Sequence, residues 1–178
     1  MVSMIELRPY ITQAAHGAGL DPRLVEAVVL IESGGDTWAW NPEPKYRYFW
    51  NVRAKTPFRP VTPAEVAGKV PPADFPTLAS DPDQEWWGQQ ASWGLMQVMG
   101  AVARELGYRG AFLTQLSDSA TGLFYGCKKL KNELVWADRD ARAALAAYNG
   151  GRVGNKPGTS PLRNAAYADK VITRLAML

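Results

Sequence analysis

The spacing of hydrophobic and polar residues along the chain is mainly that of α-helices. Apolar residues recur at intervals of three and four over residues 4–18, 22–32, 101–106, 118–136 and 140–148, and from Ser160-Pro161 nearly to the C-terminus. Asp21 followed by Pro22 is typical of a helix start, and Ser160-Pro161 is read in the same way. The segment Ser33-Gly34-Gly35 is typical of a helix end. We therefore expect a mainly α fold, with Glu32 in the last turn of the second helix.

The helical pattern is lost between Thr37 and Ser92. Prolines recur throughout this stretch and alternate with aromatic residues in WAWNPEPKYRYFWN, residues 38–51, and in DQEWWGQQ, residues 83–90. The pattern predicts a long irregular insertion, rich in aromatic residues and proline, at about residues 37–91, with one short helix near residues 63–70. With 178 residues, we expect a single domain over residues 1–178 that contains this insertion.

Composition narrows the class of protein. The chain is 47% hydrophobic and 21% charged, as is usual for a globular protein, and its formal net charge of +3 comes without a basic run. We therefore expect no nucleic-acid partner. No stretch is long and apolar enough to predict membrane insertion. Cys127 is the only cysteine and His16 the only histidine, so we expect no internal disulfide and no metal site built from such residues. The first 20 residues, MVSMIELRPYITQAAHGAGL, lack the features of a signal peptide.

An ionisable residue at the end of the apolar run EAVVLIESGG, residues 26–35, raises a chemical question. Burial and the negative end of the helix dipole both disfavour a carboxylate at Glu32, so its pKa should be raised. A raised pKa is what a general acid needs near neutral pH. The alternative is a solvated glutamate followed by a glycine that ends the helix, and on pattern alone this alternative is favoured.

Two further motifs change that balance. SWGLMQVMG occupies residues 92–100, and ALAAYNGG occupies residues 144–151. Together with IESGG, they resemble in order and chemistry the motifs of the soluble lytic transglycosylase family, whose catalytic domain is similar to goose-type lysozyme. LSDSATGLFYGCKKL, residues 116–130, and YADKV, residues 167–171, resemble the family's connecting helix and its terminal tyrosine helix. The resemblance covers roughly residues 18–36 and 91–175 and implies a lysozyme-like α-helical fold.

The resemblance implies a reaction that needs one carboxylate. Glu32 would be the sole acid and base, and it would first protonate the glycosidic oxygen between N-acetylmuramic acid and N-acetylglucosamine in peptidoglycan. It would then take the proton from the muramyl C6 hydroxyl, which attacks its own anomeric carbon to give a 1,6-anhydro sugar. Because the substrate supplies the nucleophile, a second carboxylate is not required, unlike in most glycosidases. Neither a metal nor a cofactor is implied.

The resemblance also implies substrate-binding residues. Ser33 would orient the substrate or the Glu32 backbone, and it could equally be a hydroxyl that ends a helix. Met96 and Gln97 would line the sugar cleft, although Met96 could be a core residue. The remaining three are a Tyr148 hydroxyl near Glu32, an Asn149 amide on a sugar, and Tyr167, which could reach the cleft or serve only as a packing anchor.

The insertion departs from the family's compact members. Its aromatic residues could form a lid or an extra wall for the glycan, or could simply pack against one another. It also carries Glu43, Asp81, Asp83 and Glu85, any of which could act as a second carboxylate and direct the reaction toward lysozyme-type hydrolysis. Glu43 is the candidate to test first.

A different class of protein fits the same motifs. A non-catalytic glycan-binding or virion structural protein could keep the fold, although it would have no need for a costly buried acid. For the enzyme, we expect a monomer whose partners are peptidoglycan glycan strands and which acts on the bacterial cell wall, in the periplasm or outside the cell. With no signal peptide expected, a bacteriophage or prophage origin, or a dedicated secretion system, would explain how it reaches that substrate.

Overall fold

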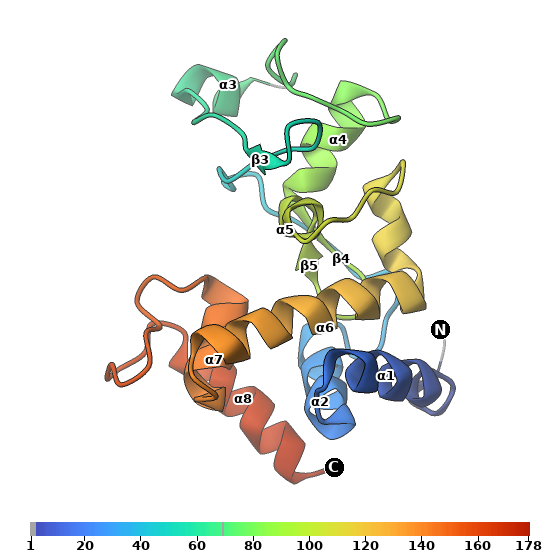
Figure 1. Ribbon diagram of the computed structural model, residues 1–178, viewed down its shortest axis with the longest axis vertical. Coiled ribbons are helices and arrows are strands. Elements are labelled where there is room, and N and C mark those ends of the chain that lie inside the picture. The colour runs from blue at the N-terminus through green and yellow to red at the C-terminus, as the bar shows by residue number, and fades with distance from the viewer. Residues whose placement is uncertain (1–2, 69) are drawn as a thin grey trace. The chain divides into compact units, whose positions relative to one another are not determined.

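A computed structural model describes residues 3–68 and 70–178. The chain is mainly helical, which confirms the predicted fold class, and it divides into two compact units (Figure 1). The first unit contains the residues up to Asp36 together with Gly126–Leu178, drawn in blue and in orange to red. The second unit is Thr37–Tyr125. Each unit is described separately below.

The first unit is built from helices whose ends follow from local sequence. α1 (Met4–Ala18) begins with a capping box, in which the side chains of Ser3 and Glu6 each accept a hydrogen bond from the other residue's backbone N–H. Asp21 caps α2 (Pro22–Glu32), and Pro22 occupies its first turn, as predicted. The C-terminal part of α6 (Ser119–Trp136), α7 (Ala141–Gly150) and α8 (Ala165–Ala176) complete the unit.

The helix α2 packs against both α1 and α8, and α8 packs in turn against α7. Val25, Val28 and Val29 of α2 are completely buried, as are Leu7 and Ile11 of α1. The side chains of α7 from position 143 to 148 are all buried, and four of these six residues are alanines. Small side chains let two helices approach closely, so the alanines of α7 allow a short distance between this helix and its neighbour α8.

The start of the last helix was predicted wrongly. α8 begins at Ala165, after Asn164, and not at Ser160-Pro161. Upstream of Asn164, the backbone N–H of Arg163 donates to the Gly154 carbonyl at 2.9 Å, and that of Asn164 donates to the Asn155 side chain, also at 2.9 Å. The preceding residues are therefore tied into a loop that doubles back on itself, and the helix can start only after it.

The second unit combines short strands with short helices. β1 (Trp40–Pro42), β4 (Ala91–Trp93) and β5 (Val98–Met99) form an antiparallel sheet in the order β1-β4-β5. β2 (Trp50–Asn51) pairs with β3 (Thr56–Pro57) in a separate hairpin. The helices are α3 (Pro63–Ala67), α4 (Pro82–Gln89), α5 (Gly100–Glu105), the 3₁₀ helix η1 (Leu113–Ser117) and the first residues of α6.

The insertion is more regular than its sequence predicted. α3 confirms the short helix expected near residues 63–70, but α4 and the short strands were missed. The start signal of α4 is Asp81 followed by Pro82, the same pair of residue types that predicts the start of α2. An apolar periodicity does not reveal this helix, because its buried residues are Glu85, Gly88 and Gln89 together with a single apolar residue, Trp86.

Aromatic side chains form the core of the insertion. Phe49 stacks on Trp86 with ring centroids 4.0 Å apart, and Phe75 meets Trp86 edge to face at 4.9 Å. Glu85 of α4 and Arg104 of α5 form a fully buried ion pair of 2.7 Å. These aromatic residues therefore pack against one another, as the simpler interpretation of the insertion predicted.

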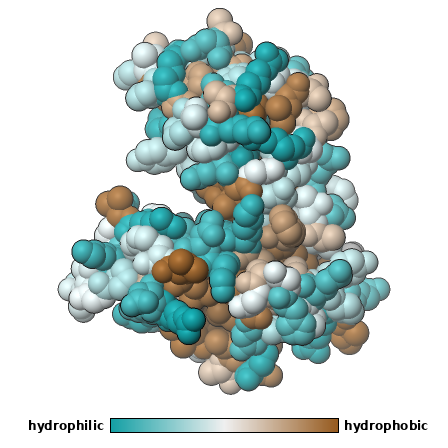
Figure 2. Space-filling view, in the orientation of Figure 1, coloured by the Kyte–Doolittle hydropathy of each residue, from teal (hydrophilic) through white to brown (hydrophobic). Residues whose placement is uncertain are grey.

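The outer surface of both units is chemically mixed on the face shown in Figure 2, where hydrophilic residues surround smaller hydrophobic areas. Across residues 3–68 and 70–178, the structure has no helix with both the length and the apolar character needed to cross a membrane.

Candidate functional site

Glu32 is the last residue of α2, as the sequence predicted. The backbone N–H of Ser33 still donates to the Val29 carbonyl at 3.0 Å, and then the chain turns sharply. Gly34 and Gly35 both adopt a left-handed conformation, with φ of 63° and 88°. Residues with a side chain rarely take this conformation, so the two glycines end the helix immediately after the glutamate.

The Glu32 carboxyl group is held by a tyrosine from the far end of the chain. The Tyr167 hydroxyl on α8 donates a hydrogen bond of 2.5 Å to Glu32 Oε1. This short contact exists because α8 packs directly on α2. Both residues are half-buried. Tyr167 therefore orients one of the two carboxyl oxygens of Glu32.

The environment of Glu32 favours its protonated form. Burial raises the pKa of Glu32 above its ordinary value, while the Tyr167 hydrogen bond and the positive charge of Lys129 lower it by smaller amounts. Burial and the Glu32 charge also raise the pKa of Tyr167, so this hydroxyl keeps its proton and remains a donor. The raised pKa expected from the sequence is thus found in the structure, with burial as its main cause.

Tyr148 lies beside this pair, on α7. Its side chain is 2% exposed, and burial together with the Glu32 charge raises its pKa well above the ordinary value. The Lys129 ammonium group lies 3.9 Å from the centre of the Tyr148 ring and donates to the Tyr148 backbone carbonyl at 2.8 Å. Three helices therefore bring Glu32, Tyr148 and Tyr167 together, and α6 adds Lys129.

A set of asparagines holds the segment after Tyr148. Asn149 is exposed, and its side-chain oxygen accepts a hydrogen bond of 2.9 Å from the Asn164 amide. The completely buried Asn155 amide donates to Asn164 Oδ1 at 3.1 Å and to the Gly151 carbonyl at 2.8 Å. A side chain at Gly150 would meet Asn164 Oδ1 at 2.1 Å, so this position needs a glycine. Asn149 thus presents its side chain from a firmly held turn.

Ser33 fastens the turn that follows the acid. Its hydroxyl donates to the Val29 carbonyl at 3.1 Å and accepts from the Gly35 N–H at 3.2 Å. The Ser33 hydroxyl thus adds a second hydrogen bond to the Val29 carbonyl and binds the backbone of the turn that follows the helix. These bonds are those of a hydroxyl that ends a helix, and the role of Ser33 in orienting the substrate or the Glu32 backbone remains a prediction.

Met96 and Gln97 belong to the second unit. Met96 is completely buried, and Gln97 is half-buried with a positive φ of 45°. The Gln97 amide donates to the Ala39 and Gly94 carbonyls at 3.0 and 2.9 Å, and its oxygen accepts from the Ser92 hydroxyl at 3.0 Å. These bonds fix the turn between β4 and β5. As cleft residues, Met96 and Gln97 remain predictions.

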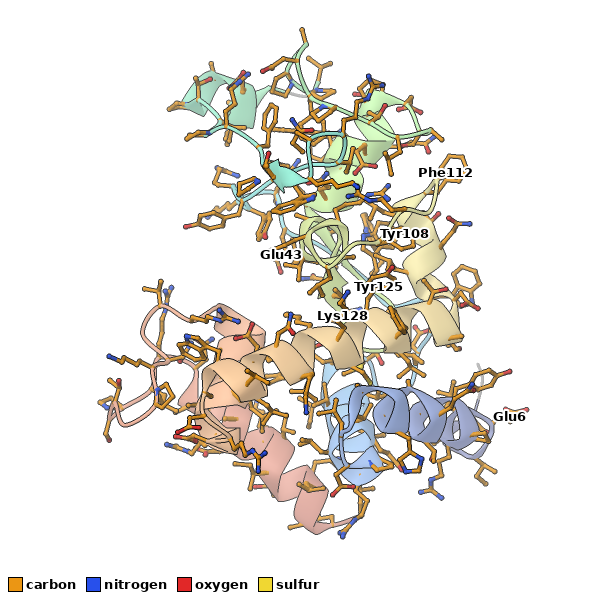
Figure 3. All side chains as sticks on the ribbon, viewed as in Figure 1. Glu6, Glu43, Tyr108, Phe112, Tyr125 and Lys128 are labelled. Carbon is orange, nitrogen blue, oxygen red and sulfur yellow. The ribbon has the colours of Figure 1, made fainter. Side chains whose placement is uncertain are left out.

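The acidic residues of the insertion differ in accessibility. Glu43 is exposed and accepts a hydrogen bond of 2.6 Å from the Asn41 amide (Figure 3). Asp81 caps α4 by accepting from the Gln84 N–H at 2.9 Å. Glu85 is 1% exposed and is held by Arg104, so a substrate cannot reach it. Glu43 therefore stays the candidate for a second carboxylate, and it remains a prediction.

Sequence reasoning missed Lys129, Asn155 and Asn164. Lys129 lies three positions after Gly126, which is buried in the structure, and so stands at the edge of the buried face of α6. This helical spacing is the only signal for Lys129. The asparagines lie in or next to a loop, and nothing in the sequence singles them out. Within the described ranges, no three His, Cys, Asp or Glu side chains gather where they could hold a metal ion.

The mainly helical fold, with a carboxyl group at the end of α2, is consistent with a lysozyme-like architecture. The model of the transglycosylase SLT domain family matches residues 9–160, which is most of the chain, and the chain belongs to this family. It is therefore a lytic transglycosylase, and its substrate is the peptidoglycan of the cell wall. A comparison with curated proteins finds no significant match. The matched range ends before Tyr167, so the role of that residue depends on its contact with Glu32.

Proposed function

We propose that the protein cleaves the β-1,4 bond between N-acetylmuramic acid and N-acetylglucosamine with Glu32 as its only general acid and base. The observation that carries this proposal is the half-buried Glu32 carboxyl group, bound by Tyr167 at 2.5 Å and with a raised pKa caused by burial. Such a group is protonated to higher pH than an ordinary glutamic acid and can donate a proton to a leaving group.

The reaction needs two proton transfers through this carboxyl group. Because Tyr167 occupies Oε1, Glu32 holds its transferable proton on Oε2 and gives it to the glycosidic oxygen as the bond to the anomeric carbon breaks. The resulting carboxylate takes the proton of the muramyl C6 hydroxyl, whose oxygen forms a new bond to the same carbon. The products are a 1,6-anhydromuramyl end and a free N-acetylglucosamine hydroxyl. Glu32 regains its proton, and no water is consumed.

The other motif residues support the acid or bind the glycan in this proposal. Ser33 fixes the backbone after Glu32, Tyr148 packs beside the carboxyl group, and Asn149 offers its exposed amide to an N-acetyl or hydroxyl group of the sugar. For Met96 and Gln97, the proposal rests on the Gly-Leu-Met-Gln motif that they share with the family. We also propose that the whole chain acts as one monomeric catalytic domain, because the family match runs through both units.

The proposal is tested by mass spectrometry of the soluble products formed from purified peptidoglycan. The wild-type protein should release muropeptides lighter by one water than those that a lysozyme releases. The Glu32→Gln variant should lose about 10²- to 10⁴-fold in rate, the usual contribution of general acid catalysis, and its melting temperature should not fall below that of the wild-type protein. Glu26→Gln, on the same helix, is a matched control because Glu26 binds Arg8 and lies away from the site.

Other products would point to other reactions. Products with a free reducing end would show hydrolysis, and loss of such products in Glu43→Gln would identify the second carboxylate. If neither the wild-type protein nor Glu32→Gln releases soluble products, while both sediment with peptidoglycan, the protein is a glycan-binding protein and the proposal is wrong.

A further inference from the structure

Lys129 occupies an unusual position for a lysine. Its side chain is half-buried, and its ammonium group contacts Tyr148 twice, at 2.8 Å from the backbone carbonyl and at 3.9 Å from the ring centre. The carbonyl belongs to the last turn of α7, where the final four carbonyl groups have no partner within the helix. A cation at this end also interacts favourably with the helix dipole. One ammonium group thus fastens both the backbone and the ring of Tyr148.

The charges around Lys129 are distributed unevenly. Two carboxyl groups act on it, Glu32 of α2 and Glu133 of its own helix. Glu133 is already paired with Arg152, whose side-chain nitrogen lies 2.9 Å from Glu133 Oε2. Arg152 in turn lies over the ring of Trp136 at 5.2 Å. Glu133 therefore has a cation of its own, and the charge of Lys129 acts chiefly toward Glu32 and Tyr148.

The groups that face Glu32 come from three helices: Tyr167 from α8, Tyr148 from α7 and Lys129 from α6. Cys127, also on α6, acts on Tyr148 and is buried. Lys129 is the one cation among the groups that act on Glu32 in the described residues. Its charge favours the carboxylate form of Glu32, whereas burial favours the protonated form.

We propose that Lys129 is a positioning residue of the active site, which fixes Tyr148 at the end of α7 and supplies the positive charge that stabilises Glu32 after it has given up its proton. The proposal rests on the function proposed above. A carboxyl group that is only buried would remain protonated and would be a poor base for the second proton transfer. The Lys129 ammonium group stabilises the Glu32 carboxylate that forms during the reaction. Burial keeps the Glu32 carboxyl group protonated before the reaction begins.

Three substitutions separate the hydrogen bond from the charge. Lys129→Met keeps the length of the side chain but removes both, Lys129→Gln keeps a hydrogen-bond donor but removes the charge, and Lys129→Arg keeps the charge. Lys131→Met is the matched control, because Lys131 is exposed on the same helix. The readout is kcat/KM for release of soluble products from purified peptidoglycan across a range of pH, with melting temperatures measured in parallel.

The charge predicts a definite shift of the pH profile. In Lys129→Met and Lys129→Gln, kcat/KM should fall by about tenfold or more, which is a typical effect of removing one interaction of this kind. The alkaline limb of the profile should move to higher pH, because Glu32 then loses a charge that lowers its pKa. Lys129→Arg should restore the position of the limb, and Lys131→Met should behave as the wild-type protein does.

A second measurement keeps this proposal separate from the proposed function. The titration of the Glu32 carboxyl carbon, followed by NMR in the wild-type protein and in Lys129→Gln, needs no activity at all. An upward shift of the Glu32 pKa in the variant supports the role of Lys129 even if the protein releases no product. An unchanged Glu32 titration would overturn the proposal, as would a loss of activity with an unmoved alkaline limb that Lys129→Arg does not rescue.

Discussion

The hydrogen bond between Tyr167 and Glu32 gives a quantitative prediction. Tyr167→Phe removes one oxygen atom and leaves the ring in place. The bond is 2.5 Å long, and its acceptor becomes a carboxylate once Glu32 has given up its proton. Hydrogen bonds to charged groups contribute about 1.5–3 kcal/mol. Because the bond is stronger in the transition state, where charge develops on Glu32, this energy is lost mainly from the rate.

The expected loss follows directly. Since about 1.4 kcal/mol corresponds to a factor of ten, kcat/KM should fall by about 10- to 150-fold in Tyr167→Phe. The alkaline limb of the pH profile of kcat/KM should also move to higher pH. The Tyr167 hydrogen bond lowers the pKa of Glu32, so its removal should raise that pKa. The assay is the release of soluble fragments from purified peptidoglycan between about pH 4 and about pH 9. This range covers the pH values at which a glutamic acid with an ordinary or a raised pKa loses its proton.

The exposed Tyr10 on α1 offers a control, because Tyr10→Phe removes the same atom away from the site. It should leave kcat/KM and the pH profile unchanged. If Tyr167→Phe retains the wild-type kcat/KM and the same alkaline limb, the hydroxyl does not act on Glu32, and the reasoning from this contact is refuted.

Three predictions concern stability. Burial raises the pKa of Glu32, so the folded protein holds this proton to higher pH than the unfolded chain, whose pKa is near 4.5, and the charged group destabilises the fold at pH 7. Glu32→Gln should therefore raise the melting temperature at pH 7 but not below pH 4.5. Equal effects at both pH values would contradict this. Asn155→Ala should cost about 1–3 kcal/mol in urea unfolding, because it removes the buried amide that binds the Ala146 and Gly151 carbonyls and the Asn164 backbone N–H, and an unchanged midpoint would contradict it. Arg104→Met should cost about 3–5 kcal/mol, because it removes the cation of a fully buried ion pair, and a loss below about 1 kcal/mol would contradict this.

Local signals in the sequence were enough to place Glu32, the proposed acid and base, at the end of its helix. Asp21 and Pro22 start α2, and the left-handed glycines after Ser33 end it, so the position of Glu32 at the helix end was predicted correctly. These signals are reliable because they depend only on backbone conformation and on the next few residues. The same kind of signal before α4 was overlooked, because that helix buries polar side chains that hide its periodicity.

The partners of Glu32 could not be derived in the same way. Lys129 meets Tyr148 only because α6 and α7 lie together, and Asn155 contacts Asn164 only because a loop folds back on itself. No spacing within one helix encodes such contacts. The start of α8 was misplaced for the same reason, since the bonds of that loop decide where the helix can begin. Tyr167 was predicted only because its motif resembles one in the family, and the structure then supplied its contact with Glu32.

In the proposed reaction, the nucleophile comes from the substrate and not from water. This is tested by digestion of purified peptidoglycan in water enriched in a heavy oxygen isotope, followed by mass spectrometry of the released fragments. The muramyl ends formed by the wild-type protein should carry no heavy oxygen, because the C6 hydroxyl closes the ring. Incorporation of one heavy oxygen atom at each new muramyl end would show that water attacks the anomeric carbon and that the proposed reaction is wrong.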